Sequence, residues 1–400
     1  MSEDGDSQTT QTPLLTLRVT FRFTKVAKGT DMTNVLLLGA GTIGRMIATL
    51  LVQTGDYAVR VADSDAESLR RLKAKVNVET VVIDAACEDQ LLAAMNGQTV
   101  VISALTFSLN PGVARAALAA GASYFDLTED VETTIAVRAV SAAAKPGQIF
   151  MPQCGLAPGF VGIAAHHLAQ KFDSLDSLLL RVGALPEFPT NSLKYNLTWS
   201  TDGLINEYCN PCDVIHQGKR QEVWPLEGFE HLSIDGVEYE AFSTSGGLGT
   251  LCETFDGRVR ELNYKTIRYM GHRERMLLLL DELRLRDRRP LLKEILENAV
   301  PRTLQDVVVI FCTATGQRDG QMIQLWDARK VYHQKHGDEV WSAIQITTAA
   351  AMCASVDMHL HGQLPSTGFV RQEQVDFDTF LANRFGQHYV GPAAQTNMSS

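Results

Sequence analysis

Hydrophobic residues between Asn34 and Pro152 form short runs rich in Val, Ile and Leu, and amphipathic stretches separate one run from the next. This alternation is typical of parallel strands that are each followed by a helix, because such a sheet is covered on both faces. Strands are predicted at 35–39, 57–62, 78–83, 99–105, 122–127 and 148–152. Helices are predicted at 42–55, 65–75, 88–95 and 111–119, and in a stretch that ends near 144.

The pattern changes after Cys154, where longer strand-like segments follow at 175–185, 193–200 and 237–246. Further elements are predicted as helices at 274–285 and 291–298, strands at 307–313 and 322–331, and an Ala-rich helix at 341–360. The small side chains of this last helix suit close packing on the first sheet. The sequence therefore predicts an α/β fold, a Rossmann-type doubly wound parallel sheet with an inserted α+β mixed-sheet second domain.

The same pattern suggests where the domains begin and end. We expect a disordered leader at 1–31, the first part of the parallel-sheet domain at 32–153, the inserted domain at 154–338, a return to the first domain at 339–390, and a disordered tail at 391–400. The inserted domain is expected to bind substrate and to carry the contacts of a homodimer, because its strands could present an edge to a second copy.

Composition narrows the class of protein. Of the 400 residues 45% are hydrophobic and 20% charged, which suits large buried cores, and the net charge of -10 argues against nucleic acid or anionic lipid as partners. The seven cysteines are spread along a chain that needs no covalent staples, so reduced thiols are expected. No apolar run has the length of a membrane span, and the acidic start lacks the features of a secretory signal, so no membrane and a cytoplasmic location are expected.

A glycine motif follows the first predicted strand. Gly39, Gly41 and Gly44, with Thr42 and Ile43 between the last two, end that strand and open a helix. The first glycine permits a sharp turn, the second lets the backbone approach a pyrophosphate, and the third lets the helix pack closely on the strand. The motif predicts a dinucleotide site.

An acidic residue, Asp63, ends the second predicted strand, where a carboxylate can accept hydrogen bonds from the adenosine ribose. The residues that follow, Ser64 and Asp65, offer no cation for a 2′-phosphate, so NAD is favoured over NADP. Later strand ends at the same sheet edge are expected to complete the cofactor site, with Asp84, Ser103, Ala104 and Leu105 as candidates. Asp84 and Ser103 could instead be ordinary helix caps.

Several segments resemble the saccharopine dehydrogenase-like enzymes, from Met32 to about Glu373. The resemblance is found at 39–44, 154–159, 245–247 and, most specifically, 264–272, where Ile267 and Met270 replace the Leu and Pro common in the family. It implies a Rossmann unit interrupted by a second domain, an NAD(P)-linked amine oxidation, and a small amino-acid or polyamine-derived substrate bound between the domains.

Three potential cations, Lys265, Arg268 and His272, lie within eight residues and could bind a substrate carboxylate. They could equally be structural, paired with acids such as Glu261, and Lys194 and Tyr195 are weaker candidates.

Hydride transfer from an amine needs a neutral nitrogen, so a base must first remove a proton. Asp126, which matches a family position near substrate and cofactor, is the leading candidate, and Glu129 and Asp130 follow in the same loop. Cys154 matches a substrate-side position of the family and is assigned packing and polarity. No metal site is expected, because neither Cys209 and Cys212 nor the His pairs form a full ligand set.

The sequence hypothesis is NAD-dependent oxidative deamination of the ε-amine of L-lysine, since a small basic cluster suits one α-carboxylate. One alternative is saccharopine dehydrogenase or reductase activity, or a related carboxy-polyamine dehydrogenase, and saccharopine would require more cations. A different class of alternative is a non-catalytic NAD-binding sensor or scaffold.

Overall fold

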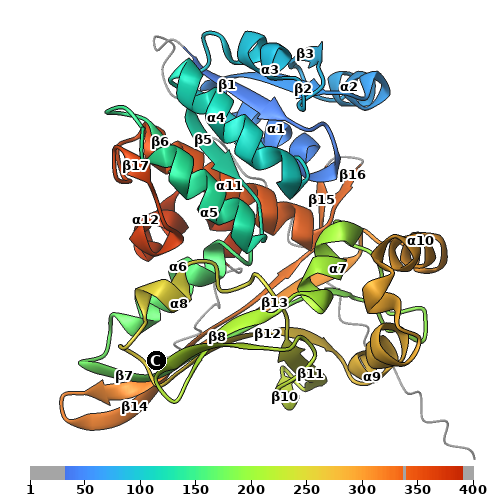
Figure 1. Ribbon diagram of the computed structural model, residues 1–400, viewed down its shortest axis with the longest axis vertical. Coiled ribbons are helices and arrows are strands. Elements are labelled where there is room, and N and C mark those ends of the chain that lie inside the picture. The colour runs from blue at the N-terminus through green and yellow to red at the C-terminus, as the bar shows by residue number, and fades with distance from the viewer. Residues whose placement is uncertain (1–31, 337–338, 391–400) are drawn as a thin grey trace, which may run out of the picture. The chain divides into compact units, whose positions relative to one another are not determined.

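The computed structural model describes residues 32–336 and 339–390, and two large β-sheets organise them (Figure 1). The predicted leader and tail lie outside the described residues. Among the helices that the structure describes, none combines the length and hydropathy needed to cross a membrane.

The first sheet has seven parallel strands in the order β17-β6-β5-β4-β1-β2-β3. The strands are β1 Thr33–Leu38, β2 Tyr57–Asp63, β3 Glu79–Val82, β4 Val100–Ser103, β5 Ser123–Asp126, β6 Ile149–Met151 and β17 Gly368–Phe369. The strand order reverses direction at β1, which is where open α/β sheets place their ligands, beyond the carboxyl ends of the strands.

Helices cover both faces of this sheet because its strands are apolar on both sides. In β1, Val35 and Leu37 belong to one hydrophobic core, while Leu36 and Leu38 belong to another. The helices that follow the strands are α1 Thr42–Thr54, α2 Ala66–Lys73, α3 Glu88–Met95, α4 Asn110–Ala120 and α5 Val131–Ser141. The Ala-rich helix α11, Ala343–Leu360, is almost entirely buried and packs on α1, as its small side chains predicted.

The second sheet has eight strands and is mixed, since β12 and β7 pair parallel while the other pairs are antiparallel. Its main path is β10-β11-β12-β7-β13-β14, with β8 paired to β12 and β9 to β8. The strands are β7 Ser174–Pro186, β8 Cys212–His216, β9 Lys219–Val223, β10 Glu230–Ile234, β11 Val237–Ser243, β12 Glu261–Tyr269, β13 Asp306–Arg318 and β14 Gln321–Tyr332. The predicted fold class is confirmed.

Shorter elements complete the described chain. The helices are α6 Phe160–Ala169, α7 Thr201–Cys209, α8 Leu251–Thr254, α9 His272–Leu277, α10 Arg289–Ala299 and α12 Phe377–Ala382. The strands β15 Gln334–His336 and β16 Glu339–Trp341 form a small hairpin, and single-turn helical segments lie at Phe107–Leu109, Leu278–Glu282, Leu285–Asp287, Gln372–Gln374 and Gly386–Tyr389.

The predicted strand at 193–200 is wrong. Lys194 has a φ of 50°, and the Asn191 side chain donates to the Tyr195 carbonyl at 2.7 Å, so the segment turns instead of extending. Helix α7 follows it and was not predicted. The predicted helix at 274–285 is interrupted, since α9 ends at Leu277 and gives way to a π-helical turn.

Candidate functional site

The glycine motif forms the tight turn between β1 and α1. Gly39 has a φ of 104°, and a Cβ on Gly44 would lie 1.9 Å from the Gly39 carbonyl oxygen, so neither position accepts a side chain. A Cβ on Gly41 would meet no atom within 4 Å. The turn therefore leaves free space in front of the α1 N-terminus, where unpaired backbone N–H groups favour phosphate, and these residues fit a dinucleotide.

Asp63 contacts this turn directly. Its Oδ2 accepts a hydrogen bond from the Ala40 amide at 2.6 Å, and its Oδ1 accepts one from the Asp65 amide at 2.8 Å. Each carboxylate oxygen keeps a second acceptor site that a ribose hydroxyl could use. Ser64 and Thr42 are exposed beside the turn, and Ile43 is half-buried.

The other predicted strand-end residues divide into two groups. Ala104 and Leu105 line a cavity together with Ile43. Ser103 is buried and donates to Asn110 Oδ1 at 2.7 Å, while Asp84 is exposed and accepts from the Ala86 amide at 2.9 Å. These two side chains therefore make local hydrogen bonds, and neither is the helix cap of the alternative interpretation, because the N-caps of α3 and α4 are Cys87 and Leu109.

The cavity lined by Ile43, Ala104 and Leu105, the central cavity, has a volume of about 220 Å³. It lies between the carboxyl ends of the first sheet and one face of the second. Its other lining residues include Leu127, Thr128, Glu129, Gly155, Leu156, Ala157, Pro158, Val182, Ala184, Trp199, Asp202, Gly203, Glu207, Tyr264, Thr266 and Arg268. Segments 154–159 and 264–272, on which the family resemblance rests, thus both reach it.

Strand alternation along β12 decides which predicted cation enters the central cavity. Tyr264, Thr266 and Arg268 line it, whereas Lys265 points to the opposite face and donates to Glu230 Oε2 at 2.7 Å. The expectation that all three cations converge on one pocket is therefore wrong for Lys265.

His272 is 1% exposed and lines neither this cavity nor the one described below. Its Nδ1 lies 2.7 Å from the Leu193 carbonyl oxygen and its Nε2 lies 3.0 Å from the Tyr208 hydroxyl. Burial lowers the pKa of His272 to about 3, so the ring is neutral. Tyr208 in turn accepts a hydrogen bond from Arg268 Nε at 2.9 Å, so His272 acts on Arg268 through Tyr208.

Arg268 is the cation that faces the central cavity. Arg268 is 3% exposed, and its guanidinium lies 4.9 Å from the centre of the Tyr195 ring. Lys194, the other weaker candidate, donates a hydrogen bond to the Met270 carbonyl. Within the described ranges no carboxylate lies at ion-pair distance from Arg268, and Glu207 interacts with it electrostatically at longer range. A buried guanidinium without a paired anion is costly, and a substrate carboxylate would compensate it.

Asp126, the predicted base, does not reach the cavity. It is fully buried and accepts hydrogen bonds from the Tyr124 hydroxyl at 2.7 Å, the Thr128 amide at 2.9 Å and the Gln153 amide at 3.1 Å. Burial raises its pKa to about 6, but the carboxylate holds two loops in place and lines no described cavity. Cys154 is likewise fully buried, donates from Sγ to the Met151 carbonyl at 3.1 Å, and has its pKa raised by burial.

Three other carboxyl groups do line the central cavity, those of Glu129, Asp202 and Glu207, and Asp202 is paired with Lys293 at 2.6 Å. Burial raises the pKa of Glu129 to about 7 and that of Glu207 to about 8. Both groups can therefore exchange protons near neutral pH. Glu129 belongs to the loop identified from the sequence, whereas Glu207 was missed because α7 was not predicted. Ser200 caps α7 by accepting from the Gly203 amide at 3.2 Å, and this polar residue before Thr201 was a usable signal.

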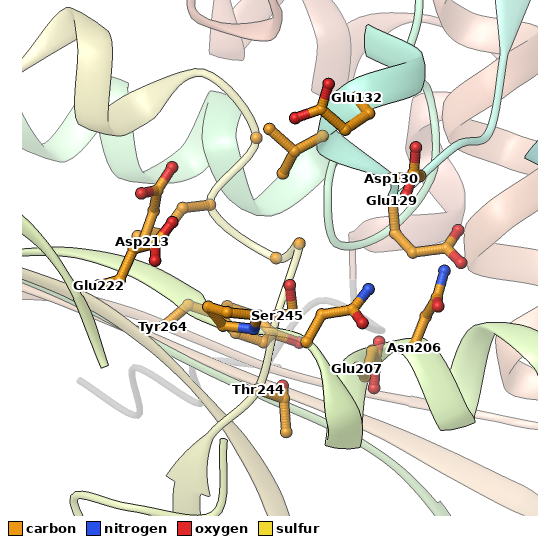
Figure 2. A pocket seen from close by; sticks show the side chains of 17 residues that line it. Glu129, Asp130, Glu132, Asn206, Glu207, Asp213, Glu222, Thr244, Ser245 and Tyr264 are labelled. Carbon is orange, nitrogen blue, oxygen red and sulfur yellow. The ribbon is translucent and has the colours of Figure 1, made fainter. Parts of the chain in front are cut away.

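A second cavity of about 230 Å³, the acidic cavity, adjoins the central one and shares Glu129, Glu207 and Tyr264 with it. Figure 2 shows acids entering it from the loop and start of α5, from α7, and from β8 and β9. Ser245, Gly246 and Gly247 form part of its wall.

The described part of the chain contains no cluster of side chains suited to binding a metal ion. Within residues 32–336 and 339–390, no three His, Cys, Asp or Glu side chains come together in an arrangement that could hold a metal ion.

The parallel sheet, the glycine turn bonded to Asp63, and the adjoining cavity define a dinucleotide-binding α/β protein with a second, mixed-sheet lobe. Residues 35–151 match the family model described as the saccharopine dehydrogenase NADP binding domain, and residues 155–388 match the saccharopine dehydrogenase C-terminal domain. The chain therefore belongs to the saccharopine dehydrogenase family, as its motifs predicted, and its cofactor is a nicotinamide dinucleotide.

Individual relatives are distant. The chain is 24% identical over 220 residues to the mitochondrial alpha-aminoadipic semialdehyde synthase of Rattus norvegicus, covering 51% of this chain and 24% of that protein. It is 27% identical over 200 residues to saccharopine dehydrogenase [NADP(+), L-glutamate-forming] of Saccharomyces cerevisiae, covering 48% of this chain and 44% of that protein. The chain thus spans less than half the length of these curated relatives.

The fold has a solved counterpart. The apo structure of saccharopine dehydrogenase (L-Glu forming) from Saccharomyces cerevisiae aligns with a TM-score of 0.72 at 18% identity, covering 87% of this chain and 96% of that one. At this identity the likeness establishes the shared fold.

Proposed function

We propose that the chain is a nicotinamide-dinucleotide-dependent oxidoreductase that oxidises an amino-bearing carbon, with the ε-amine of L-lysine as substrate and NAD as oxidant. One observation carries the choice of substrate. Arg268 is the single Lys, Arg or His side chain among the residues that line the central cavity, where it faces Glu129, Asp202 and Glu207. This balance suits a substrate with one carboxylate and more than one amine. Saccharopine brings two further carboxylates and would need more cations.

The cofactor would be held by the glycine turn, the α1 N-terminus and Asp63, and Ile43, Ala104 and Leu105 would contact it where they border the cavity. When bound, the nicotinamide accepts a hydride. The NAD preference is supported by the first two cations of α2, because Arg70 lies 2.6 Å from Glu67 and Arg71 lies 3.8 Å from Asp65. A 2′-phosphate would have to compete with these acids for the two cations, although the name of the matched domain mentions NADP.

The residues of the chain then have separate tasks. Arg268 binds the substrate carboxylate, and His272 acts as a positioning residue that holds Tyr208 against Arg268. Glu129 or Glu207 takes a proton from the substrate ammonium, so that the neutral amine can lose a hydride from its carbon and become an iminium ion. Water adds to that ion, and the C–N bond breaks to give the aldehyde and ammonia. Asp126 and Cys154 support the loops around this site, and Lys265 supports the opposite face of β12.

The test is to incubate the purified full chain with lysine and NAD while following absorbance of the reduced dinucleotide, and then to repeat it with saccharopine and with NADP. We expect reduction with lysine and NAD, and a KM for lysine at least about tenfold higher in Arg268→Gln with a smaller change in kcat. Faster turnover of saccharopine would reject lysine as the substrate. Dinucleotide binding without oxidation of any amine would favour the sensor or scaffold. The homodimer and the cytoplasmic location stay predictions.

A further inference from the structure

Apart from Glu129 and Glu207, which border both cavities, the residues of the acidic cavity have no part in the proposed reaction. The acidic cavity shares a wall with the central cavity through Glu129, Glu207 and Tyr264, so one ligand could extend through both. Among the residues that the structure describes, its lining contains no Lys, Arg or His, and its carboxyl groups belong to Glu129, Asp130, Glu132, Glu207, Asp213 and Glu222.

Two of these carboxylates already have partners. Asp213 accepts from Arg220 at 2.8 Å, and Asp130 caps α5 by accepting from the Thr133 amide at 2.8 Å. Glu132 and Glu222 are exposed at the rim and form no ion pair within the described residues. The cavity therefore keeps an excess of negative charge.

The environment of Glu207 is a second, independent observation that points to a cationic ligand. Its side chain borders both cavities and is only 8% exposed, yet within the described ranges its carboxyl group has no hydrogen bond and no ion pair. Burial raises the pKa of Glu207 to about 8 even though the charge of Arg268 lowers it in part, and an ammonium ligand at its oxygens would favour the ionised carboxylate. Figure 2 shows Glu207 and Asn206 side by side on α7, among the residues that line this cavity.

We propose that the acidic cavity is a subsite for a second protonated amine of the substrate, one that is not oxidised. This rests on the proposed function, since it extends the same site. The ligands are chains that carry an ammonium group several bonds from the reacting carbon, such as basic amino acids, diamines and polyamines. A chain that carries carboxylates into this cavity meets the exposed carboxylates of Glu132 and Glu222 at the rim and finds no cation among the described lining residues.

The test measures binding without turnover. Cadaverine, a diamine, and pentylamine, a monoamine of equal chain length, are titrated calorimetrically into the full chain in the absence of dinucleotide. We expect cadaverine to bind at least about tenfold more tightly than pentylamine. In the double variant Glu132→Gln, Glu222→Gln the affinity for cadaverine should fall about fivefold, while that for pentylamine changes less than about twofold.

A matched control, Glu238→Gln with Glu282→Gln, removes two exposed carboxylates that line neither cavity and should leave both affinities unchanged. Equal binding of the two amines would overturn the subsite, as would an equal loss for both amines in the rim variant. The two proposals fail separately. If lysine reduces the dinucleotide but cadaverine binds no better than pentylamine, only the subsite is rejected. If the binding pattern holds and no amine is oxidised, only the proposed reaction is rejected.

Discussion

Replacing Glu207 with glutamine tests whether its carboxyl group is buried without a partner. Burial raises the pKa of Glu207 from 4.5 to about 8, so between these values the folded chain holds a proton that the unfolded chain releases. Stability must therefore fall as pH rises through this interval, and it is full only below the unfolded pKa. Glutamine has nearly the same shape and does not titrate, so Glu207→Gln should remove this loss.

The size of the effect follows from the two pKa values. At about 1.4 kcal/mol for each pH unit, ionising this carboxyl group in place costs roughly 4 to 5 kcal/mol once the pH is well above 8. Between about pH 5.5 and about pH 8.5 the wild-type chain should lose roughly 3 kcal/mol more stability than the variant. Glu129, whose pKa is raised to about 7, should cause a smaller loss of stability with rising pH in both the wild type and the variant.

The assay is urea unfolding followed by tryptophan fluorescence at both pH values, for wild type, Glu207→Gln and the exposed control Glu238→Gln. The control should follow wild type. If Glu207→Gln showed the same pH dependence as wild type, Glu207 would be solvated or paired in solution, and the cation subsite would lose its main support.

Four further substitutions test the dinucleotide turn and its surroundings. Gly41→Ala should leave the unfolding midpoint unchanged, because its Cβ meets no atom, yet it should weaken dinucleotide binding at least about tenfold by fluorescence titration. Gly44→Ala should lower both the unfolding midpoint and the affinity for the dinucleotide. Equal effects of the two substitutions would contradict the roles given to these glycines. Asp63→Ser should raise the NADP-to-NAD ratio of kcat/KM at least about tenfold, and an unchanged ratio would remove Asp63 from cofactor choice. Asp126→Asn should lower stability by about 1 to 3 kcal/mol in urea unfolding, because the amide cannot accept all three hydrogen bonds; full stability with lost turnover would restore Asp126 as a reacting group.

The first sheet was predictable because the sequence patterns that define its strands are local. The apolar runs and the glycine turn act over a few residues, and the central strands are buried on both faces while the edge strand β3 is more exposed, so periodicity alone placed β1 to β6 and their helices. The second sheet was harder, since its strands pair across long sequence separations. The error at 193–200 arose because Tyr195 and Leu197 are buried by packing against α7 and its neighbours, which imitates the alternation of a strand.

The site was predictable only in part, because the spacing of residues in the sequence does not fix the direction in which each side chain points. Gly39, Gly44 and Asp63 act through the backbone of one βαβ unit, so their arrangement follows from the motif. Lys265 and Arg268 differ by an odd number of positions and must face opposite sides of a strand, and recognising 261–269 as one continuous strand would have separated them. Glu207 becomes a site residue only when α7 folds over the central cavity, which no local pattern reports.

The position of β12 between β11 and β7 has a consequence for how this fold could acquire new specificities. Its side chains at 264, 266 and 268 border the central cavity, whereas Asn263 and Lys265 are bonded to Arg181 and Glu230 on the reverse side. The backbone of β12 separates these two rows of side chains. Altering every second residue would remodel recognition while the scaffold's own ties stay intact, but inserting or deleting a single residue would exchange the rows and ruin both at once.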